Sequence, residues 1–265
     1  MPSNTLVFPA SDSGFLAQFP VRYESVRRGP QNLFRSGAKM FSPSESRLRS
    51  RWTMNFGYLS NGERDRMEEF LSAAEGEGRP FLFFDPLGNL LQHSEDLGNP
   101  VWTRTGAVDV AQFNDPDLGE AFVITNTSPG WGALEQTLPF GFGYLGCFSV
   151  QTKWDSAVPM RLRISDANGL SEAEISAHEP RRSYVKRKTA ASAESTTVSI
   201  GIAPNTQVIL VRPQLEIAAQ PGAYLPTGQR SGVVEHAWLR QDAYQWTSPA
   251  PHAHRIQLTV ESNRL

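Results

Sequence analysis

The stretch from residue 89 to about residue 228 contains no amphipathic helix of any length. Short apolar and β-branched runs recur there instead, and turn residues separate them at roughly the 8–12-residue spacing of an all-β sandwich. The candidate strands are residues 101–105, 107–113, 121–125, 132–138, 145–153, 160–165, 182–188, 196–202 and 206–214. The tetrapeptide Asp166-Ala167-Asn168-Gly169 is typical of a hairpin turn. This middle block is therefore predicted to be an antiparallel β-sandwich.

The segment before residue 89 has a different pattern of apolar and polar residues, which includes a helix. Apolar residues alternate with polar ones from Leu48 to Phe56, which indicates a half-buried strand. The run Pro80–Pro86 is apolar and aromatic, which predicts a buried strand that ends at Asp85-Pro86. Between the two lies the one convincing helix. The pattern Ser60-Asn61-Gly62-Glu63 predicts a capping box at its start.

The predicted helix has one apolar face, and a glycine-containing segment at Gly76 and Gly78 ends it. The residues expected to be buried follow helical spacing: Met67, Phe70, Leu71 and Ala74. A helix this short is not stable alone and must lie on a sheet.

The last segment is expected to return to the N-terminal block. Strands are predicted at residues 233–239, 243–247 and 254–261, with Ser248-Pro249-Ala250-Pro251 connecting the last two. The N-terminal block alone has too few strands for a good core, and three more would complete it. The sequence therefore predicts a discontinuous domain, residues 1–88 with 229–265, interrupted by an inserted sandwich, residues 89–228. The predicted fold class is mainly β with one helix.

Composition excludes several classes of function. A net charge of −2 offers no basic excess for a phosphate backbone, so nucleic acid is not an expected partner. Pro80–Pro86, the longest apolar stretch, is too short to span a bilayer, so membrane insertion is not expected. The N-terminus lacks the pattern of a signal peptide. The single cysteine, Cys147, lies in an apolar run and is interpreted as a buried core residue.

No motif predicts catalysis, a metal or a cofactor. His252 and His254 lie in a proline-rich turn with no further ligand nearby in sequence, and they are interpreted as loop residues. The run from Gly141 to Gly146 fits G-x-G-x-x-G but lacks a surrounding βαβ unit, so its expected role is to let aromatics pack beside a strand bend. Glu172 and Glu174 are interpreted as a solvated face. The protein is therefore not expected to be an enzyme.

Two tryptophans are candidates for stacking on a sugar ring. Trp131 lies in a predicted turn, and Trp154 lies at a strand end. Flat aromatic rings bury large areas at low entropic cost, although packing in the core or at its rim is the simpler role for both. Trp52 and Trp102 are predicted to be core residues. The basic run Arg181–Lys188 is interpreted as a solvated strand edge, with an acidic partner or an anionic glycan as the alternative.

A first resemblance rests on Arg51-Trp52-x-Met54-x-Phe56, on the helix that opens at Leu59-Ser60 and ends in Phe70-Leu71, and on Gly76-x-Gly78-Arg79-Pro80-Phe81-x-Phe83-x-Asp85-Pro86. These residues resemble the N-terminal domain of siphophage distal tail proteins and related minor tail proteins. The resemblance implies a small β-rich domain that oligomerises into a ring at the end of the tail tube.

A second resemblance joins two distant stretches. The opening, Asn89–Gly106, and the closing signatures, Pro213–Glu216 and Gly222–Thr227, are similar to those of a jelly-roll module of carbohydrate-binding type. Such modules are common in phage tail and receptor-binding proteins. The inserted sandwich is expected to project outward, where it contacts a host surface saccharide, braces the tip or decorates it.

Together the resemblances imply a structural virion protein of a phage tail. It would form a homo-oligomeric ring, a hexamer, that joins the tail tube protein to the proteins of the tail tip, and no catalytic residue carries over. Candidate interface residues are Arg22, Tyr23, Arg27 and Arg28, together with the long loop 29–45. The alternatives are a host-glycan adhesion module and a glycan hydrolase that uses acidic residues of the sandwich.

Overall fold

The computed structural model describes residues 5–28, 31–33, 39–41, 47–75, 78–153, 159–175, 181–240 and 243–263. The described chain is mainly β with one helix, and its sheets include an antiparallel sandwich, which confirms the predicted fold class. It divides into a first unit, residues 1–9, 17–83 and 234–265, and a second unit, residues 10–16 and 84–233. The predicted domain limits, 1–88 with 229–265 and 89–228, stay a prediction. No helix in the described ranges is long and apolar enough to cross a membrane.

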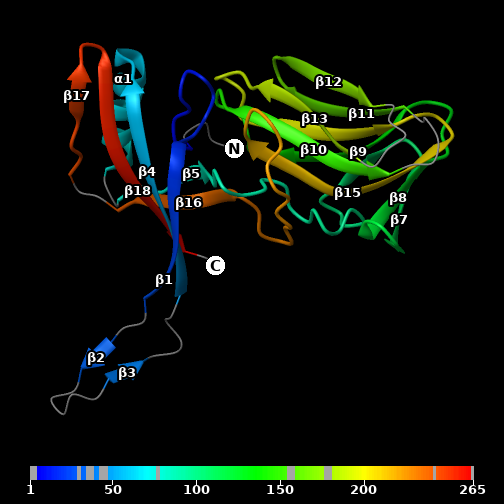
Figure 1. The fold of residues 1–265 in the computed structure, drawn as a ribbon, viewed down its shortest axis with the longest axis horizontal. Helices are drawn as coiled ribbons and strands as arrows, with labels where there is room; N and C mark the ends of the chain where they lie inside the picture. Colours follow the sequence, from blue (N-terminus) through cyan, green and yellow to red (C-terminus); the bar gives the residue numbers. More distant parts are fainter. Residues whose placement is uncertain are drawn as a thin grey trace. The chain divides into compact units, whose positions relative to one another are not determined.

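The first unit is built on a six-stranded sheet (Figure 1). The order is β1 (Gln18–Arg28), β4 (Arg47–Leu59), β18 (Ala253–Asn263), β16 (Val233–Leu239) and β5 (Phe81–Phe84), and β17 (Thr247–Ala250) pairs with β18. The C-terminal strand β18 thus lies beside β4, with Leu258 opposite Met54. Strands β2 (Gln31–Leu33) and β3 (Lys39–Phe41) form a small hairpin within the segment that was predicted to be a long loop.

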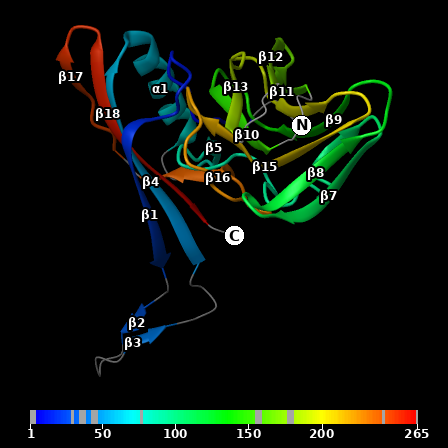
Figure 2. The ribbon, with the colours of Figure 1, turned by 45° about the vertical axis from the view of Figure 1, so that its right-hand side comes forward.

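Helix α1 (Asn61–Ala74) lies beside β4 and β18, as Figures 1 and 2 show, and it contacts both strands. The capping box is confirmed, because the Glu63 backbone N–H donates to Ser60 Oγ at 3.2 Å and the Ser60 N–H donates to the Glu63 carboxylate at 2.9 Å. The four predicted apolar residues of the helix are buried. Phe8 completes this core, with its ring centre 5.1 Å from that of Phe70 and 5.7 Å from that of Phe83.

The second unit contains two five-stranded sheets whose pairings are all antiparallel (Figure 2). One sheet has the order β13 (Arg181–Lys188), β10 (Leu145–Lys153), β15 (Thr206–Ile217), β8 (Gly119–Asn126) and β7 (Val108–Asp115). The other has the order β12 (Gly169–Ile175), β11 (Met160–Asp166), β14 (Thr196–Ile202), β9 (Gly132–Leu138) and β6 (Thr103–Thr105). The hairpin turn predicted at Asp166–Gly169 joins β11 to β12.

The predicted core residues are confirmed at three positions. Trp52 and Trp102 are 3% and 2% exposed, and Cys147 is fully buried. Trp102 also donates from its indole nitrogen to the His93 carbonyl at 3.1 Å, so its polar edge is satisfied within the core.

One buried side chain ties the start of the sandwich to its end. The Asn89 amide donates to the carbonyls of Pro213 and Leu225, both at 3.1 Å, and its oxygen accepts from the Leu91 and Leu215 N–H groups. A buried amide with all four partners is fully satisfied. Asn89 therefore explains physically why the opening and closing signatures occur together in this sequence.

The two ends of the same segment also meet through the backbone. The Asp85 N–H donates to the Gly232 carbonyl at 2.7 Å, and the Gly232 N–H donates to the Asn89 carbonyl at 2.7 Å. The chain thus leaves for the sandwich and returns from it at neighbouring positions.

Strand β17 differs from its prediction. It spans Thr247–Ala250, which the sequence interpretation treated mainly as a connection, and residues 243–246 are not part of a strand. It pairs with β18 at only two positions, and all four of its residues are exposed. An edge strand tolerates Pro249 because one side of it needs no ladder donor, which is why a proline-rich segment can form this strand.

Candidate functional site

Two of the predicted interface residues of β1, Arg22 and Tyr23, point to opposite faces of the strand. Arg22 is largely exposed and pairs with Glu24, with 2.6 Å between the guanidinium and the carboxylate. Tyr23 turns to the opposite face, where its hydroxyl lies 3.1 Å from Ser50 Oγ and its ring centre 5.6 Å from that of Trp52. Strand alternation separates the two. Arg27 and Arg28 end β1, and their side chains are not among those described, so the interface itself stays a prediction.

The outward-pointing side chains of the β12-β11-β14-β9-β6 sheet form a regular polar array. The inward positions, such as Leu162, Ile200 and Leu134, are fully buried. Alternate residues face the other way and lie in register across the five strands. We call this array, with Trp131 beside it, the polar face; its members are Glu172, Glu174, Arg161, Arg163, Ser165, Thr197, Ser199, Gly201, Glu135, Thr137, Thr103, Thr105 and Trp131, and the apolar Leu170 and Ala133 lie on the same side of the sheet.

Trp131 lies at one end of the polar face, in the turn that precedes β9. Its ring is stacked against Arg161, whose guanidinium carbon lies 3.9 Å from the ring centre. The indole also lies over Gly201, since a Cβ added there would sit 3.6 Å from the ring carbon Cε3. Trp131 is half-buried, so only part of its surface is covered. The second tryptophan predicted to stack on a sugar, Trp154, lies outside the described residues.

Glu172 and Glu174 are not simply solvated. Glu172 accepts from Arg163 at 2.5 Å and lies 3.5 Å from Arg161 Nε, while Glu174 lies 3.5 Å from the terminal nitrogen of Arg161. Carboxylates therefore hold both guanidinium groups of the polar face. The second carboxylate on Arg161 also restrains the group that stacks on Trp131.

Ser199 lies at the centre of the polar face, opposite Arg163 on one side and Glu135 on the other. It is 3% exposed, and its hydroxyl has no hydrogen-bond partner among the described residues. An unsatisfied buried hydroxyl costs free energy. Such a group gains a hydrogen bond when a polar ligand reaches it.

The second sheet of the sandwich carries a different outer face. Arg182 donates two hydrogen bonds to Ser149 Oγ, at 3.1 and 2.9 Å. Gln214 is buried and holds the closing segment, because its amide donates to the Ala223 carbonyl and its oxygen accepts from Leu225 N–H. Because this closing segment lies close to the outer face of the second sheet, fewer polar groups of that face are free to bind a ligand.

The basic run on β13 is only partly the solvated edge that the sequence predicted. Strand β13 does lie at the edge of its sheet, and Lys186 and Lys188 are exposed. Arg187 instead pairs with the buried Asp166 at 2.9 Å. Burial lowers the pKa of Arg182, and the negative charge of nearby Glu216 partly offsets this decrease.

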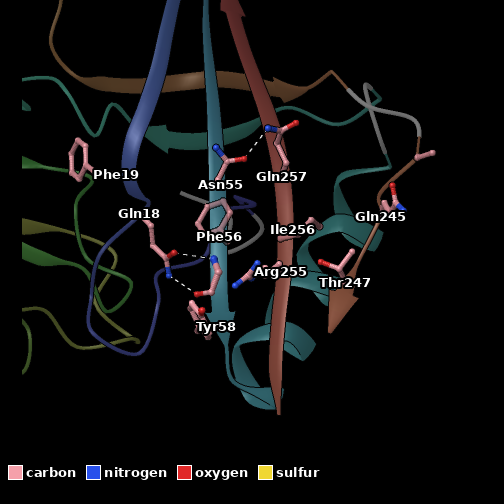
Figure 3. Close-up of a pocket in the computed structure, with 12 residues that line it drawn as sticks. Gln18, Phe19, Asn55, Phe56, Tyr58, Gln245, Thr247, Arg255, Ile256 and Gln257 are labelled. Atoms are coloured by element: carbon pink, nitrogen blue, oxygen red, sulfur yellow. Dashed lines mark hydrogen bonds between the residues drawn. The ribbon is translucent and has the colours of Figure 1, made fainter. Parts of the chain in front are cut away.

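The first unit has an open groove of about 650 Å³ at one end of β4 and β18 (Figure 3). Phe19 and Tyr58 line it, and they are the two most exposed large apolar side chains of the described chain, at 68% and 73%. Arg255 lies over the Tyr58 ring, 4.9 Å from its centre. Side-chain amides supply most of the remaining polar groups of the groove. Figure 3 shows the hydrogen bond that the Gln257 amide donates to the Asn55 side-chain oxygen. Of the described residues that line the groove, Arg255 alone is charged.

Groups that could act in catalysis or metal binding are mostly engaged elsewhere. Burial raises the pKa of the Cys147 thiol to about 12, and a protonated thiol is a poor nucleophile. His252 lies in the turn before β18 and hydrogen-bonds to Asn61 at 2.8 Å, which fits its interpretation as a loop residue. For His254 that interpretation is wrong, because it is buried in strand β18, where it hydrogen-bonds to Ser248 at 2.9 Å and to Asn61 at 2.8 Å. Among the residues that the structure describes, no three or more His, Cys, Asp or Glu side chains gather to hold a metal ion.

A small pocket between β8 and β15 holds two carboxylates. It has a volume of about 160 Å³ and is lined by Glu95, Glu120 and Arg212, among others. The Tyr224 hydroxyl donates a hydrogen bond to the Glu95 carboxylate at 2.5 Å. The pKa of Tyr224 is raised, mainly because the group is buried and secondly because the Glu95 carboxylate is close to it. The pocket is smaller than the roughly 300–1,000 Å³ of most small-molecule sites. It offers little room for a sugar ring.

Sequence reasoning identified Trp131 but missed the residues around it. Arg161 and Ser199 are 30 and 68 positions away along the chain and reach Trp131 or its neighbours only through strand pairing. The one usable signal was the alternation of Arg161 and Arg163 with buried apolar residues in β11, which marks both as outward-facing.

No protein-family profile matches the chain, and no curated protein matches it. Solved structures similar to it include the enzymatically active domain of tailspike protein 4 from bacteriophage CBA120, with 16% identity and a TM-score of 0.39. That match covers 49% of this chain and 21% of the tailspike chain, so the two share only about a fifth of the tailspike's length.

Carbohydrate-binding modules are also among the similar structures. The module TmCBM61, solved with β-1,4-galactotriose, has 14% identity, a TM-score of 0.39 and coverage of 49% of this chain and 99% of its own. A xylan-binding domain of CBM 22 has 11% identity, a TM-score of 0.40 and coverage of 51% and 99%. At these scores none of the matches assigns a family.

Proposed function

We propose that the protein is a saccharide-binding structural protein and that the polar face of its second unit holds the saccharide. The observation that carries this proposal is the stacking of Trp131 on Arg161 beside an array of hydrogen-bonding side chains. The proposal assigns binding to the chain and no catalysis.

Saccharides combine weakly apolar ring faces with many hydroxyl groups. An aromatic ring offers area for the first, and side chains that both donate and accept suit the second. The polar face supplies both kinds of group. Thr103 and Thr105 are exposed on β6, and Glu135 lies between them and Ser199. Polar side chains fixed on strands of a rigid sheet bind with little loss of conformational freedom.

The test is a screen of the purified full chain on an array of bacterial and plant surface glycans, followed by calorimetric titration of those that bind. We expect Trp131→Ala to weaken binding by about tenfold or more, which equals about 1.4 kcal/mol of binding free energy. The matched control is Tyr184→Ala, since Tyr184 is an exposed aromatic on the outer face of the other sheet. Equal affinity in wild type and Trp131→Ala would remove the polar face from the binding site.

We also propose that the first unit self-associates into a ring, which in a phage tail would join the tube to the tip. Two observations support it: β1 is an edge strand, and the groove beside it exposes Phe19 and Tyr58. Exposed aromatic and arginine side chains are enriched at protein interfaces. A closed ring, such as the hexamer implied by the resemblance, requires two different complementary surfaces on each subunit.

Native mass spectrometry and sedimentation of the full chain test this second proposal. We expect an oligomer of defined copy number that Phe19→Ser and Tyr58→Ser dissociate at a given concentration. Leu225→Ser, which changes an exposed residue of the second unit, is the control and is expected to leave the mass unchanged. A monomer at all accessible concentrations, both alone and with tail proteins, would argue against a ring.

A further inference from the structure

We infer that the ligand of the polar face is an uncharged oligosaccharide and that Arg161 serves as a positioning residue for Trp131, with no role in binding an anion. This inference rests on the proposed function, because it names the class of saccharide that the same site accepts.

The charges of the polar face disfavour an anionic ligand. Among its described residues the polar face has two guanidinium groups, those of Arg161 and Arg163, and three carboxylates, those of Glu135, Glu172 and Glu174. Both arginines are already paired with Glu172, and Arg161 also with Glu174. No described cation of the face is left over for the carboxylate, sulfate or phosphate of an acidic sugar. An anionic ligand would also meet the like charge of Glu135, at a cost in binding free energy.

The length of the site favours an oligosaccharide. Along β14 the outward positions are Thr197, Ser199 and Gly201, which all have small side chains or none. At about 3.3 Å per residue, the four residue steps from 197 to 201 span about 13 Å. Trp131 lies at the Gly201 end of this row. A ligand that extends from Trp131 along the whole row to Thr197 therefore has to be longer than one sugar ring.

The burial of Ser199 gives a second reason to expect a ligand hydroxyl at this place. Its hydroxyl is buried and has no partner among the described side chains and backbone groups. A hydroxyl of the ligand that enters between Arg163 and Glu135 would satisfy it. Uncharged sugars carry such hydroxyls on every ring.

Arg161 is placed to orient Trp131. Its guanidinium carbon lies 3.9 Å from the Trp131 ring centre, and two carboxylates lie 3.5 Å from its nitrogens, while Arg161 Nε has no hydrogen-bond partner among the described residues. A guanidinium stacked on a ring and held in this way orients the indole plane. Arg161 thus acts on the ligand through Trp131. Arg163 pairs with Glu172 and, among the described residues, with no other carboxylate, so it is a matched arginine without the aromatic contact.

The test of ligand class uses pairs of probes that differ only in charge. Oligogalactose with oligogalacturonate, and gluco-oligosaccharides with their glucuronate counterparts, are titrated at two to six sugar units together with the glycans found by the array. We expect the neutral member of a pair to bind about tenfold tighter than the acidic one. We also expect its affinity to rise with length and to change little between low and high salt, because no ionic contact is screened.

The outcomes separate this inference from the proposed function. Tighter, salt-sensitive binding of the acidic member, still lost in Trp131→Ala, would overturn the inference and leave saccharide binding intact. A single sugar that binds as well as an oligomer would overturn the length argument. No Trp131-dependent binding to any probe or arrayed glycan would overturn both.

A double-mutant cycle tests the role of Arg161. If Arg161 acts only by orienting the indole, Arg161→Ala should weaken neutral-ligand binding severalfold in the wild type and have no further effect in Trp131→Ala. Arg161→Lys should restore part of the loss, and Arg163→Ala should cost less than Arg161→Ala. Additive effects of Arg161→Ala and Trp131→Ala would show that Arg161 contacts the ligand itself.

Ser199→Ala separates binding from folding. Removal of an unsatisfied buried hydroxyl is expected to leave the midpoint of urea unfolding unchanged or slightly higher. We expect the same variant to bind the neutral oligosaccharide severalfold more weakly. Unchanged affinity would exclude Ser199 from ligand contact.

Discussion

Asp166 is a fully buried carboxylate that holds several segments of the sandwich together. It accepts from Arg187 at 2.9 and 3.2 Å, from the Asn168 N–H at 2.8 Å and from the Ala190 N–H at 3.1 Å. The hydrogen bonds from Arg187, with smaller contributions from the two backbone groups, hold the pKa of Asp166 below its ordinary value although burial acts in the opposite direction. The β11–β12 turn, β13 and the segment after it thus depend on one ionised side chain.

We expect Asp166→Asn to lower the free energy of unfolding at pH 7 by about 3 kcal/mol, since it leaves Arg187 without its charged partner. The folded chain keeps Asp166 ionised to lower pH than the unfolded chain does. The contribution is therefore fully present above the ordinary aspartate pKa of about 3.9 and is lost as the pH falls below it.

Urea unfolding followed by circular dichroism between pH 2.5 and 8 measures this effect. The stability difference between wild type and Asp166→Asn should shrink as the pH falls below about 4. Asp109→Asn is the control, because Asp109 is exposed and its contact with Arg104 is long, at 3.6 Å. A difference that stays constant with pH would show that the carboxylate charge is not its source.

Gly141 belongs to the glycine-rich run that sequence reasoning interpreted as room for aromatic packing. A Cβ at Gly141 would lie 2.0 Å from the Ala193 carbonyl oxygen, and one at Gly146 would lie 2.9 Å from the Phe140 ring. The Phe140 ring in turn packs edge-on against Phe84, with 5.3 Å between the ring centres. These glycines allow close approach of backbone and aromatic groups, as the interpretation expected.

We expect Gly141→Ala to destabilise the protein by about 3 kcal/mol, because backbone atoms that cannot rotate away would have to shift. Thermal unfolding measures the change. Gly130→Ala is the matched control, since nothing lies within 4 Å of a Cβ added there. Similar midpoints for both variants would show that the close approach at Gly141 relaxes at little cost.

At the level of elements, helix α1 is set by signals next to it in the sequence. Its start depends on the reciprocal hydrogen bonds of Ser60 and Glu63, and its end on Glu75, which adopts the left-handed conformation with φ of 48°. Both features are local, so the sequence predicted the start of the helix and its buried side correctly. Its end was expected at glycines, but the left-handed residue is Glu75, and Gly76 lies outside the described residues. Long-range pairing contributes only the sheet on which the helix lies.

Ser60→Ala should lower stability by about 1 kcal/mol, the typical cost of a lost N-cap side chain. The measurement is the urea midpoint of the full chain. Ser72→Ala makes the same change at an exposed position inside the helix and should be neutral or slightly stabilising. Equal effects of the two substitutions would mean that the cap hydrogen bond adds no net stability.

The polar face shows where sequence-based prediction ends. Alternation in β11, β14 and β9 indicates which side chains point outward, and Trp131 could be singled out as an aromatic in a turn. The order of the strands decides which outward residues become neighbours, and no local pattern encodes that order. The stacking of Arg161 on Trp131 depends on the pairing of β11 with β14 and of β14 with β9, so it could not be predicted.

For the whole molecule, the division into two units predicts two unfolding events. Each unit has its own buried core, around Phe8, Trp52 and Phe83 in the first and around Phe148, Leu162 and Ile200 in the second. Differential scanning calorimetry should resolve two transitions, and a saccharide bound to the polar face should raise only the one that belongs to the second unit. A single transition that shifts as a whole would indicate one cooperative domain.

The hydrogen bond between the Asp85 N–H and the Gly232 carbonyl has a consequence for how this chain could have arisen. Because the outgoing and returning backbones already touch, a recombination event could excise the intervening segment, or exchange it for another, with a short splice and without stretching β5 or β16. The sandwich would then behave as a replaceable module, and related chains could carry an unrelated domain at the same junction while the flanking sheet stays as it is.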